Sequence, residues 1–96
     1  MELTGKCKED FEKWYDTLDD YYHLELMPKN MLYGVREDYF DSVGIYVEME
    51  TRLFDHEHTV YICYKRKYTR VGRYKTRQEA RDAAIEKANE IRNSYL

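Results

Sequence analysis

The sequence contains little of what marks several well-known classes of protein. Its two cysteines, Cys7 and Cys63, lie far apart, which excludes a Cys-x-x-Cys metal or redox motif and fits two reduced, partly buried thiols. No apolar run is longer than a few residues, so no membrane span is expected. No charged and then apolar leader opens the chain, and we therefore expect a cytoplasmic protein.

Motifs for catalysis and for cofactors are scarce as well. The two serines, Ser42 and Ser94, stand in no nucleophile motif, and the four glycines form no phosphate loop. His56 and His58 could chelate from one side of a strand, but zinc needs three or four ligands and few others are at hand. We therefore expect an exposed loop there, no metal, no cofactor and no enzyme. A small ribonuclease leaves no sequence signature and stays open as an alternative.

Tyrosine and charge are what the sequence has in abundance. Eleven of its 96 residues are tyrosines, whose apolar ring and polar hydroxyl suit half-buried faces and interfaces. The net charge of −3 hides a division along the chain. Residues 1–58 hold six basic and fifteen acidic residues, whereas residues 59–96 hold ten basic and four acidic residues. The first segment therefore has a net charge of −9 and the second a net charge of +6, which predicts two faces of opposite sign.

The positive charge is concentrated in residues 64–81, YKRKYTRVGRYKTRQEAR, where Glu79 is the one acid. Lysine and arginine neutralise phosphates, and tyrosines between them can stack on bases or sugars. We therefore predict a surface that meets RNA phosphate or an acidic protein patch. It comprises Lys65, Arg66, Lys67, Arg70, Arg73, Lys75, Arg77 and Arg81, with Tyr64, Tyr68 and Tyr74 supplying contact area. A solvated sheet face with edge-blunting lysines is the alternative.

Apolar periodicity predicts three helices within a single domain of residues 1–96. The expected helices span 5–22, 28–42 and 77–93. Thr4 suits the N-cap of the first helix and Pro28 the first turn of the second. Thr76 and Glu79 form a capping-box pattern at the start of the third.

Between the second and third helices the apolar period changes to two, as in half-buried strands. Ile45, Val47 and Met49 share one face of the first strand, and Tyr46 and Glu48 share the other. The expected strands span 45–53, 59–67 and 70–75, with a turn near 67–69. Short connections make them an antiparallel meander, so the expected fold class is α+β in the order α-α-β-β-β-α.

The outer face of the first helix is acidic. Asp16, Asp19 and Asp20 stand near its C-terminal end, where the helix dipole does not favour them. They are therefore candidates for an acidic face that meets a partner, because closely spaced carboxylates can imitate a nucleic-acid backbone. A plain solvated helix face is the alternative.

Two segments resemble small proteins encoded by phages and prophages of Bacteroidota. They are MPKNMLYGVREDYFDSVGIYV and YKTRQEARDAAIEKANEI, in which FDSVGI and TRQEARDAAIEKANEI carry the likeness over less than half of the chain. The resemblance implies a protein that binds host machinery in the host cytoplasm, and it carries over no functional residue. Inhibitors of CRISPR nucleases are the best-known such class, and RNA-targeting type VI-B systems occur in these bacteria. The implied partners are a host CRISPR effector and its guide RNA.

The order α-β-β-β-α from Pro28 onward is also similar to the double-stranded-RNA-binding domain. That family carries Lys-Lys-x-Ala-Lys at its last helix, and residues 77–81 match two of the three basic positions. In that family the loop between the first two strands carries Gly-Pro-x-His, whereas here Asp55 and Glu57 flank His56. These two acids would face the RNA and repel its phosphates. The resemblance implies a stand-alone RNA- or DNA-binding domain, with free RNA as its partner, as the alternative function.

Overall fold

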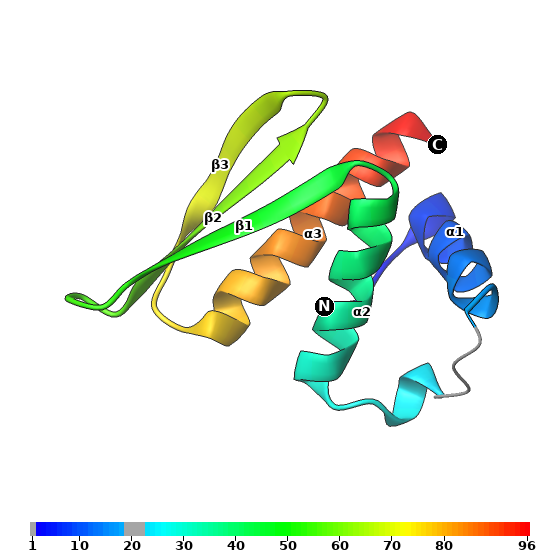
Figure 1. The fold of residues 1–96 in the computed structure, drawn as a ribbon, viewed down its shortest axis with the longest axis horizontal. Coiled ribbons are helices and arrows are strands. Elements are labelled where there is room, and N and C mark those ends of the chain that lie inside the picture. Colours follow the sequence, from blue (N-terminus) through cyan, green and yellow to red (C-terminus); the bar gives the residue numbers. More distant parts are fainter. Residues whose placement is uncertain (1, 19–22) are drawn as a thin grey trace.

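The computed structural model describes residues 2–18 and 23–96 (Figure 1). Its elements are α1 (Gly5–Asp16), the 3-10 helix η1 (Leu24–Leu26), α2 (Lys29–Ser42), β1 (Ile45–Arg52), β2 (Glu57–Tyr64), β3 (Lys67–Tyr74) and α3 (Arg77–Tyr95). The strands form one antiparallel sheet in the order β1-β2-β3. The predicted α+β class and element order are therefore confirmed.

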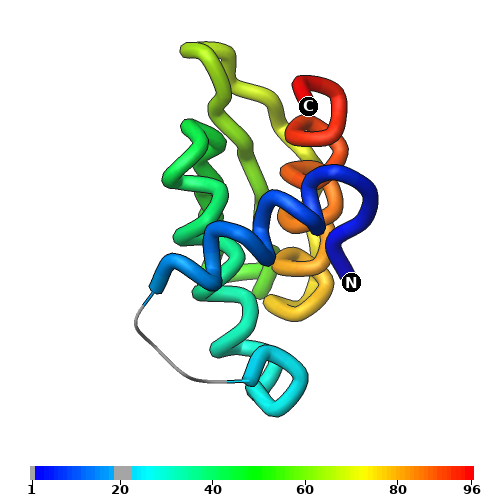
Figure 2. The backbone as a smooth tube through the Cα atoms, turned by 90° about the vertical axis from the view of Figure 1, so that its right-hand side faces the viewer, coloured from blue at the N-terminus to red at the C-terminus, as the bar shows by residue number. Residues whose placement is uncertain are grey.

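The helices form two layers on one face of the sheet. α3 packs along all three strands, α2 packs on β1 and α3, and α1 crosses the outer side of α2 and α3 (Figure 2). None of the described helices covers the opposite face, where Tyr46 and Tyr68 remain 54% and 62% exposed. Within the described ranges, no helix has both the length and the apolar character needed to cross a membrane.

The core lies between the helices and the inner face of the sheet. Tyr39 and Phe40 of α2 are fully buried there, together with Ile62 of β2. Each large side chain that is fully buried contributes about 1.5–3 kcal/mol through the hydrophobic effect. Ala80 and Ala84 of α3 are also fully buried, so the small side chains let this helix approach the sheet closely.

Side-chain amides of α3 hold the start of α1. Thr4 is the N-cap residue, but its side chain makes no capping bond and instead accepts from Nδ2 of Asn89 at 2.9 Å. Oδ1 of Asn93 accepts from the backbone N–H of Cys7 at 2.8 Å, which satisfies a donor that the helix itself leaves free. Gly5 has a φ of +62°, which favours glycine, and a Cβ there would also lie only 3.0 Å from Oδ1 of Asn93.

The first helix is shorter than the predicted 5–22. α1 ends at Asp16, where the hydroxyl of Thr17 donates to the carbonyl of Trp14 at 2.6 Å. The N–H of Leu18 bonds to the carbonyl three residues back, which tightens the last turn. Short polar side chains compete with the helical pattern in this way, and the apolar spacing does not reveal it.

The turn between the last two strands lies at Lys65–Arg66, so its prediction near 67–69 is wrong. The register pairs Tyr64 with Lys67, which leaves a loop of two residues. Both loop residues have positive φ, 52° and 65°, as a two-residue turn between twisted strands requires. Tyrosine and threonine favour strands, and pairing of residues 67–69 with β2 satisfies their backbone groups. β3 therefore spans 67–74 rather than 70–75, and β2 ends at 64 rather than 67.

The connection between β1 and β2 is also shorter than predicted. β2 begins at Glu57 rather than at 59, so His58 is buried instead of lying in an exposed loop. Its Nδ1 lies 3.0 Å from the hydroxyl of Thr51, the residue opposite on β1, which satisfies the buried ring. β1 ends at 52 rather than 53, and the other two helices follow their predicted ranges closely at 29–42 and 77–95.

A β-bulge in β3 decides which residues face away from the helices. Tyr61 pairs with Arg70, but the preceding residue of β2 pairs with Gly72, so β3 carries one extra residue. Simple alternation would place Gly72 on the outer face and Arg73 on the inner face. The bulge reverses this order, so Arg73 lies outward opposite Thr59 and Tyr74 packs inward on Ala80.

Candidate functional site

The β2–β3 turn and the C-terminal end of α3 both lie at the top of Figure 1, and residues of these two segments line one groove. Its volume is about 450 Å³. Three lysines and two tyrosines from separate elements line it, together with Thr69, Ser94 and apolar side chains. We name it the lysine–tyrosine groove after Tyr64, Lys65, Lys67, Lys87 and Tyr95. Tyr64, Lys65 and Lys67 belong to the surface predicted from the sequence, and the structure brings them together here.

The two aromatic rings position one of the lysines. The rings of Tyr64 and Tyr95 lie 4.9 Å apart between centroids, with an angle of 56° between their planes. Nζ of Lys65 lies 4.5 Å from the centroid of Tyr95 and 5.4 Å from that of Tyr64, within range of a cation–π interaction. The ammonium group is therefore held at the rim of the groove, beside two aromatic surfaces.

The groove carries net positive charge despite its position at a helix C-terminus. The end of α3 contributes roughly −0.5 of an elementary charge, which opposes an anion. Glu90 subtracts one more charge, because its Oε1 lies 3.3 Å from Nζ of Lys87. Three ammonium groups outweigh both contributions and leave about +1.5 charges locally. The exposed Arg66 stands next to the groove in the turn.

Three other predicted residues lie on the outer face of the sheet, away from the groove. Tyr68 and Arg70 face outward from β3, and Arg73 joins them because of the bulge. Nε of Arg73 lies 3.4 Å from a carboxylate oxygen of Glu57, so its charge is partly neutralised. The hydroxyl of Tyr68 donates to Oε2 of Glu48 at 2.6 Å, and this bond raises the pKa of the tyrosine.

A third group of predicted residues lies at the start of α3. Lys75 and Arg77 are exposed there, and the hydroxyl of Thr76 accepts from the N–H of Glu79 at 3.1 Å, which confirms the predicted cap. The guanidinium of Arg81 lies 5.3 Å from the ring centroid of Tyr33 on α2. This group is at the opposite end of α3 from the groove, so the predicted basic surface is divided among three places.

Two further predictions have different outcomes. Tyr74, expected to supply contact area, packs inward against Val60 and Ala80 and is partly buried, so it belongs mainly to the core. Asp16 is exposed at the end of α1, as an acidic partner face requires. Asp19 and Asp20, the other two members of that face, lie outside the described residues.

Sequence patterns alone did not indicate Lys87 and Tyr95 as members of the groove. Lys87, Ile91 and Tyr95 are spaced by four, so they share one face of α3. That spacing is a usable signal, but Lys87 stands among acids and outside the basic run. Only the position of the β2–β3 turn shows that this face meets other lysines.

The lining of the groove combines ammonium groups, which attract anions, with aromatic rings. All three histidines belong to the described part of the chain, and none of them lines the groove. Among the described residues, no three histidine, cysteine, aspartate or glutamate side chains could hold a metal ion together. Burial raises the pKa of Cys7 to about 11, so this thiol is protonated at neutral pH.

Comparisons with protein-family models, with curated proteins and with solved structures find no match to this chain.

Proposed function

We propose that this protein is a binding protein, without catalytic chemistry of its own, that holds a phosphate-rich stretch of RNA in the lysine–tyrosine groove. The observation that carries the proposal is the convergence of three lysines and two tyrosines from β2, the β2–β3 turn, β3 and α3 around one open volume of about 450 Å³. In a chain of net charge −3, such a concentration of positive charge is unexpected without a role.

The kinds of side chain favour RNA over an acidic peptide. Lysines bind phosphates as flexible point charges, whereas carboxylates are commonly recognised by the planar fork of arginine. Tyr64 and Tyr95 offer aromatic surfaces on which unpaired bases can stack. The groove therefore suits single-stranded RNA, bound through phosphates and with little sequence preference.

The backbone conformation of the β2–β3 turn supports a binding role for the two positively charged side chains that the turn carries. Lys65 and Arg66 both adopt the left-handed conformation, with φ angles of 52° and 65°. This conformation costs a residue with a side chain about 1–2 kcal/mol, and asparagine and glycine are the usual choices in such turns. Strained conformations of this kind cluster at binding sites, where the side chain is worth the cost.

The resemblance to phage proteins suggests the target. We expect the RNA to be the guide of a host RNA-guided nuclease, so that binding inhibits the nuclease. A plasmid-challenge assay measures this directly, because expression of the protein should restore transformation of a targeted plasmid. If interference is unchanged and pull-down from host lysate recovers no such nuclease, the target is a different one.

Binding of labelled single-stranded RNA over a series of salt concentrations tests the groove itself. The double variant Lys67→Gln/Lys87→Gln should bind weakly and reduce the slope of log K against log salt by about 1.4. The matched control is Lys75→Gln/Arg77→Gln, which removes the same charge at the start of α3 and should change binding little.

Each contrary result has a distinct meaning. Equal loss in the two double variants would show that binding follows overall charge rather than the groove. Loss in the control variant alone would favour the mode of a double-stranded-RNA-binding domain. No binding by the wild type at low salt would remove RNA from the proposal, and cleavage of the RNA would favour the ribonuclease alternative.

A further inference from the structure

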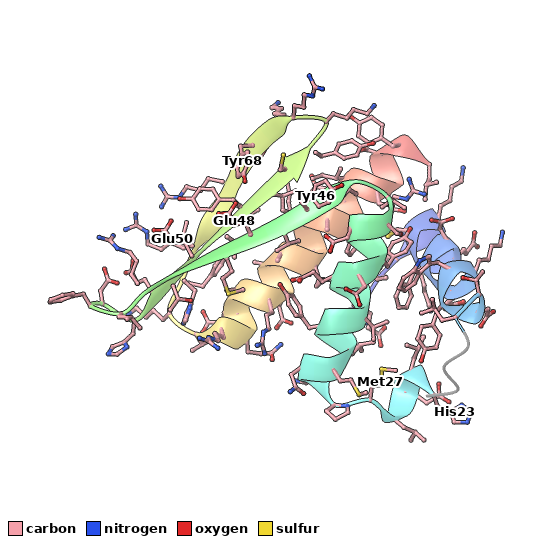
Figure 3. All side chains as sticks on the ribbon, in the orientation of Figure 1. His23, Met27, Tyr46, Glu48, Glu50 and Tyr68 are labelled. Carbon is pink, nitrogen blue, oxygen red and sulfur yellow. The ribbon has the colours of Figure 1, made fainter. Side chains whose placement is uncertain are left out.

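The face of the sheet opposite the helices is ordered in rows by the strand register. Tyr46, Cys63 and Tyr68 form one row across the strands. The next two rows are Glu48–Tyr61–Arg70 and Glu50–Thr59–Arg73. We call these nine residues the open sheet face. Figure 3 shows Glu48 and Tyr68 next to one another between β1 and β3, as their hydrogen bond requires.

Within these three rows the charges are separated by strand. Both acids, Glu48 and Glu50, lie on β1, and both arginines lie on β3. The fourth outward row, Arg52–Glu57, lies toward the β1–β2 loop, and its Glu57 pairs with Arg73 of the same chain. Tyr61, in the middle strand, lies 6.4 Å from the ring of Tyr68 between centroids. The face carries no net charge, and its two acids would repel phosphate, so RNA is a poor occupant. A protein surface with the opposite order of charge fits it.

A second copy of this chain presents that order of charge. Two sheets packed face to face can be related by a two-fold axis that runs parallel to β2 between them. Such an axis places β1 of one copy opposite β3 of the other. Glu48 then faces Arg70 of the partner subunit, and Glu50 faces Arg73 of the partner subunit. An axis perpendicular to the strands would instead place acid on acid, which excludes that arrangement.

We infer that the open sheet face is the interface of a symmetric homodimer with its two-fold axis along β2. Tyr61 and Cys63 lie on the middle strand and therefore close to their own copies across the axis. The exposed rings of Tyr46 and Tyr68 face one another between subunits, and tyrosine is enriched in the centres of protein interfaces. This inference goes beyond the proposed function, because it uses a separate surface and does not depend on RNA.

Charge reversal at residues that face one another across the two-fold axis tests the inference. Sedimentation of the wild type, measured at protein concentrations up to the millimolar range, should show a species of twice the 11.8 kDa chain mass. Glu48→Lys and Arg70→Glu should each weaken dimerisation by roughly tenfold or more, because each places two pairs of like charges in contact. An equimolar mixture of the two variants should restore the dimer, because every contact in the mixed dimer is again between opposite charges.

The mixture also distinguishes contact between subunits from changes within one subunit. Any effect of a substitution within its own chain, such as loss of the Tyr68–Glu48 bond, persists in the mixture and cannot produce rescue. A short bismaleimide should link two wild-type chains through Cys63, and Cys63→Ser should abolish the link. A wild type that stays monomeric, or a mixture that is not rescued, would overturn the inference. Neither result would affect RNA binding by the groove, which a monomer can carry out.

Discussion

At the scale of single residues, one polar junction connects all three helices. The hydroxyl of Tyr39 on α2 donates to Oδ2 of Asp10 on α1 at 2.6 Å. Arg92 on α3 donates to the same carboxylate oxygen at 2.9 Å and to the tyrosine hydroxyl at 3.2 Å. Hydrogen bonds from Tyr39 and then from Arg92 lower the pKa of Asp10 below its ordinary value. The junction therefore favours the charged carboxylate in the folded state.

We expect Asp10→Ala to lower the free energy of unfolding at pH 7 by about 1–2 kcal/mol, because two partly buried donors lose their acceptor. Since the pKa of Asp10 is lower in the folded chain, its contribution is complete above about pH 4 and is lost as the pH falls further. Urea denaturation at pH 7 and pH 3 measures both effects. The variant should lose less stability on acidification than wild type, and the exposed Glu9→Gln serves as control.

The two cysteines should differ in reactivity. Cys7 is fully buried and its raised pKa, about 11, keeps the thiol protonated, whereas Cys63 is partly exposed on the open sheet face. Mass spectrometry after maleimide treatment should find one label on the native protein and two after denaturation. Native Cys63→Ser should take up none, and rapid labelling of that variant would show that α1 leaves the core easily.

At the scale of elements, the β2–β3 turn combines backbone strain with positive charge. We expect Arg66→Gly to raise the free energy of unfolding by about 1 kcal/mol, because glycine adopts the left-handed conformation at little cost. Arg66→Ala removes the same charge without this relief, so it should not stabilise. Both variants should lose a similar part of RNA affinity. Thermal unfolding and the RNA titration together measure these outcomes, and equal stability of the two variants would contradict the role of strain.

The β2–β3 hairpin and the elements on either side of it differ in how far the sequence predicts them. The cap at Thr76 and the alternation of Ile45 and Val47 are local patterns, so the elements that they mark could be predicted. The turn at Lys65–Arg66 lacks the asparagine or glycine that normally marks such a turn. The bulge beside Gly72 accompanies the inward packing of Tyr74, a tertiary contact that alternation along the strand does not predict. Local patterns therefore could not locate either feature.

At the scale of the whole molecule, the predicted basic surface is not continuous. Strand alternation, the bulge and the length of α3 distribute its members among the groove, the open sheet face and the start of α3. Residues that are adjacent in sequence lie on opposite faces of a strand, as Lys67 and Tyr68 do. Lys87 joins the groove from a distant part of the sequence. Composition could thus predict that positive charge matters, but only the fold shows where it is concentrated.

The direction of the proposed two-fold axis has a consequence for the β2–β3 turn. An axis parallel to β2 places both copies of this turn, and both grooves, at the same end of the dimer. One continuous RNA could then occupy two grooves at once, and the second contact would form at a high effective concentration. Affinity should therefore rise steeply with RNA length beyond the span of one groove. In the dimer-deficient Glu48→Lys variant, RNA affinity should rise only gradually with RNA length. Avidity would then be a property of the dimer rather than of the single subunit.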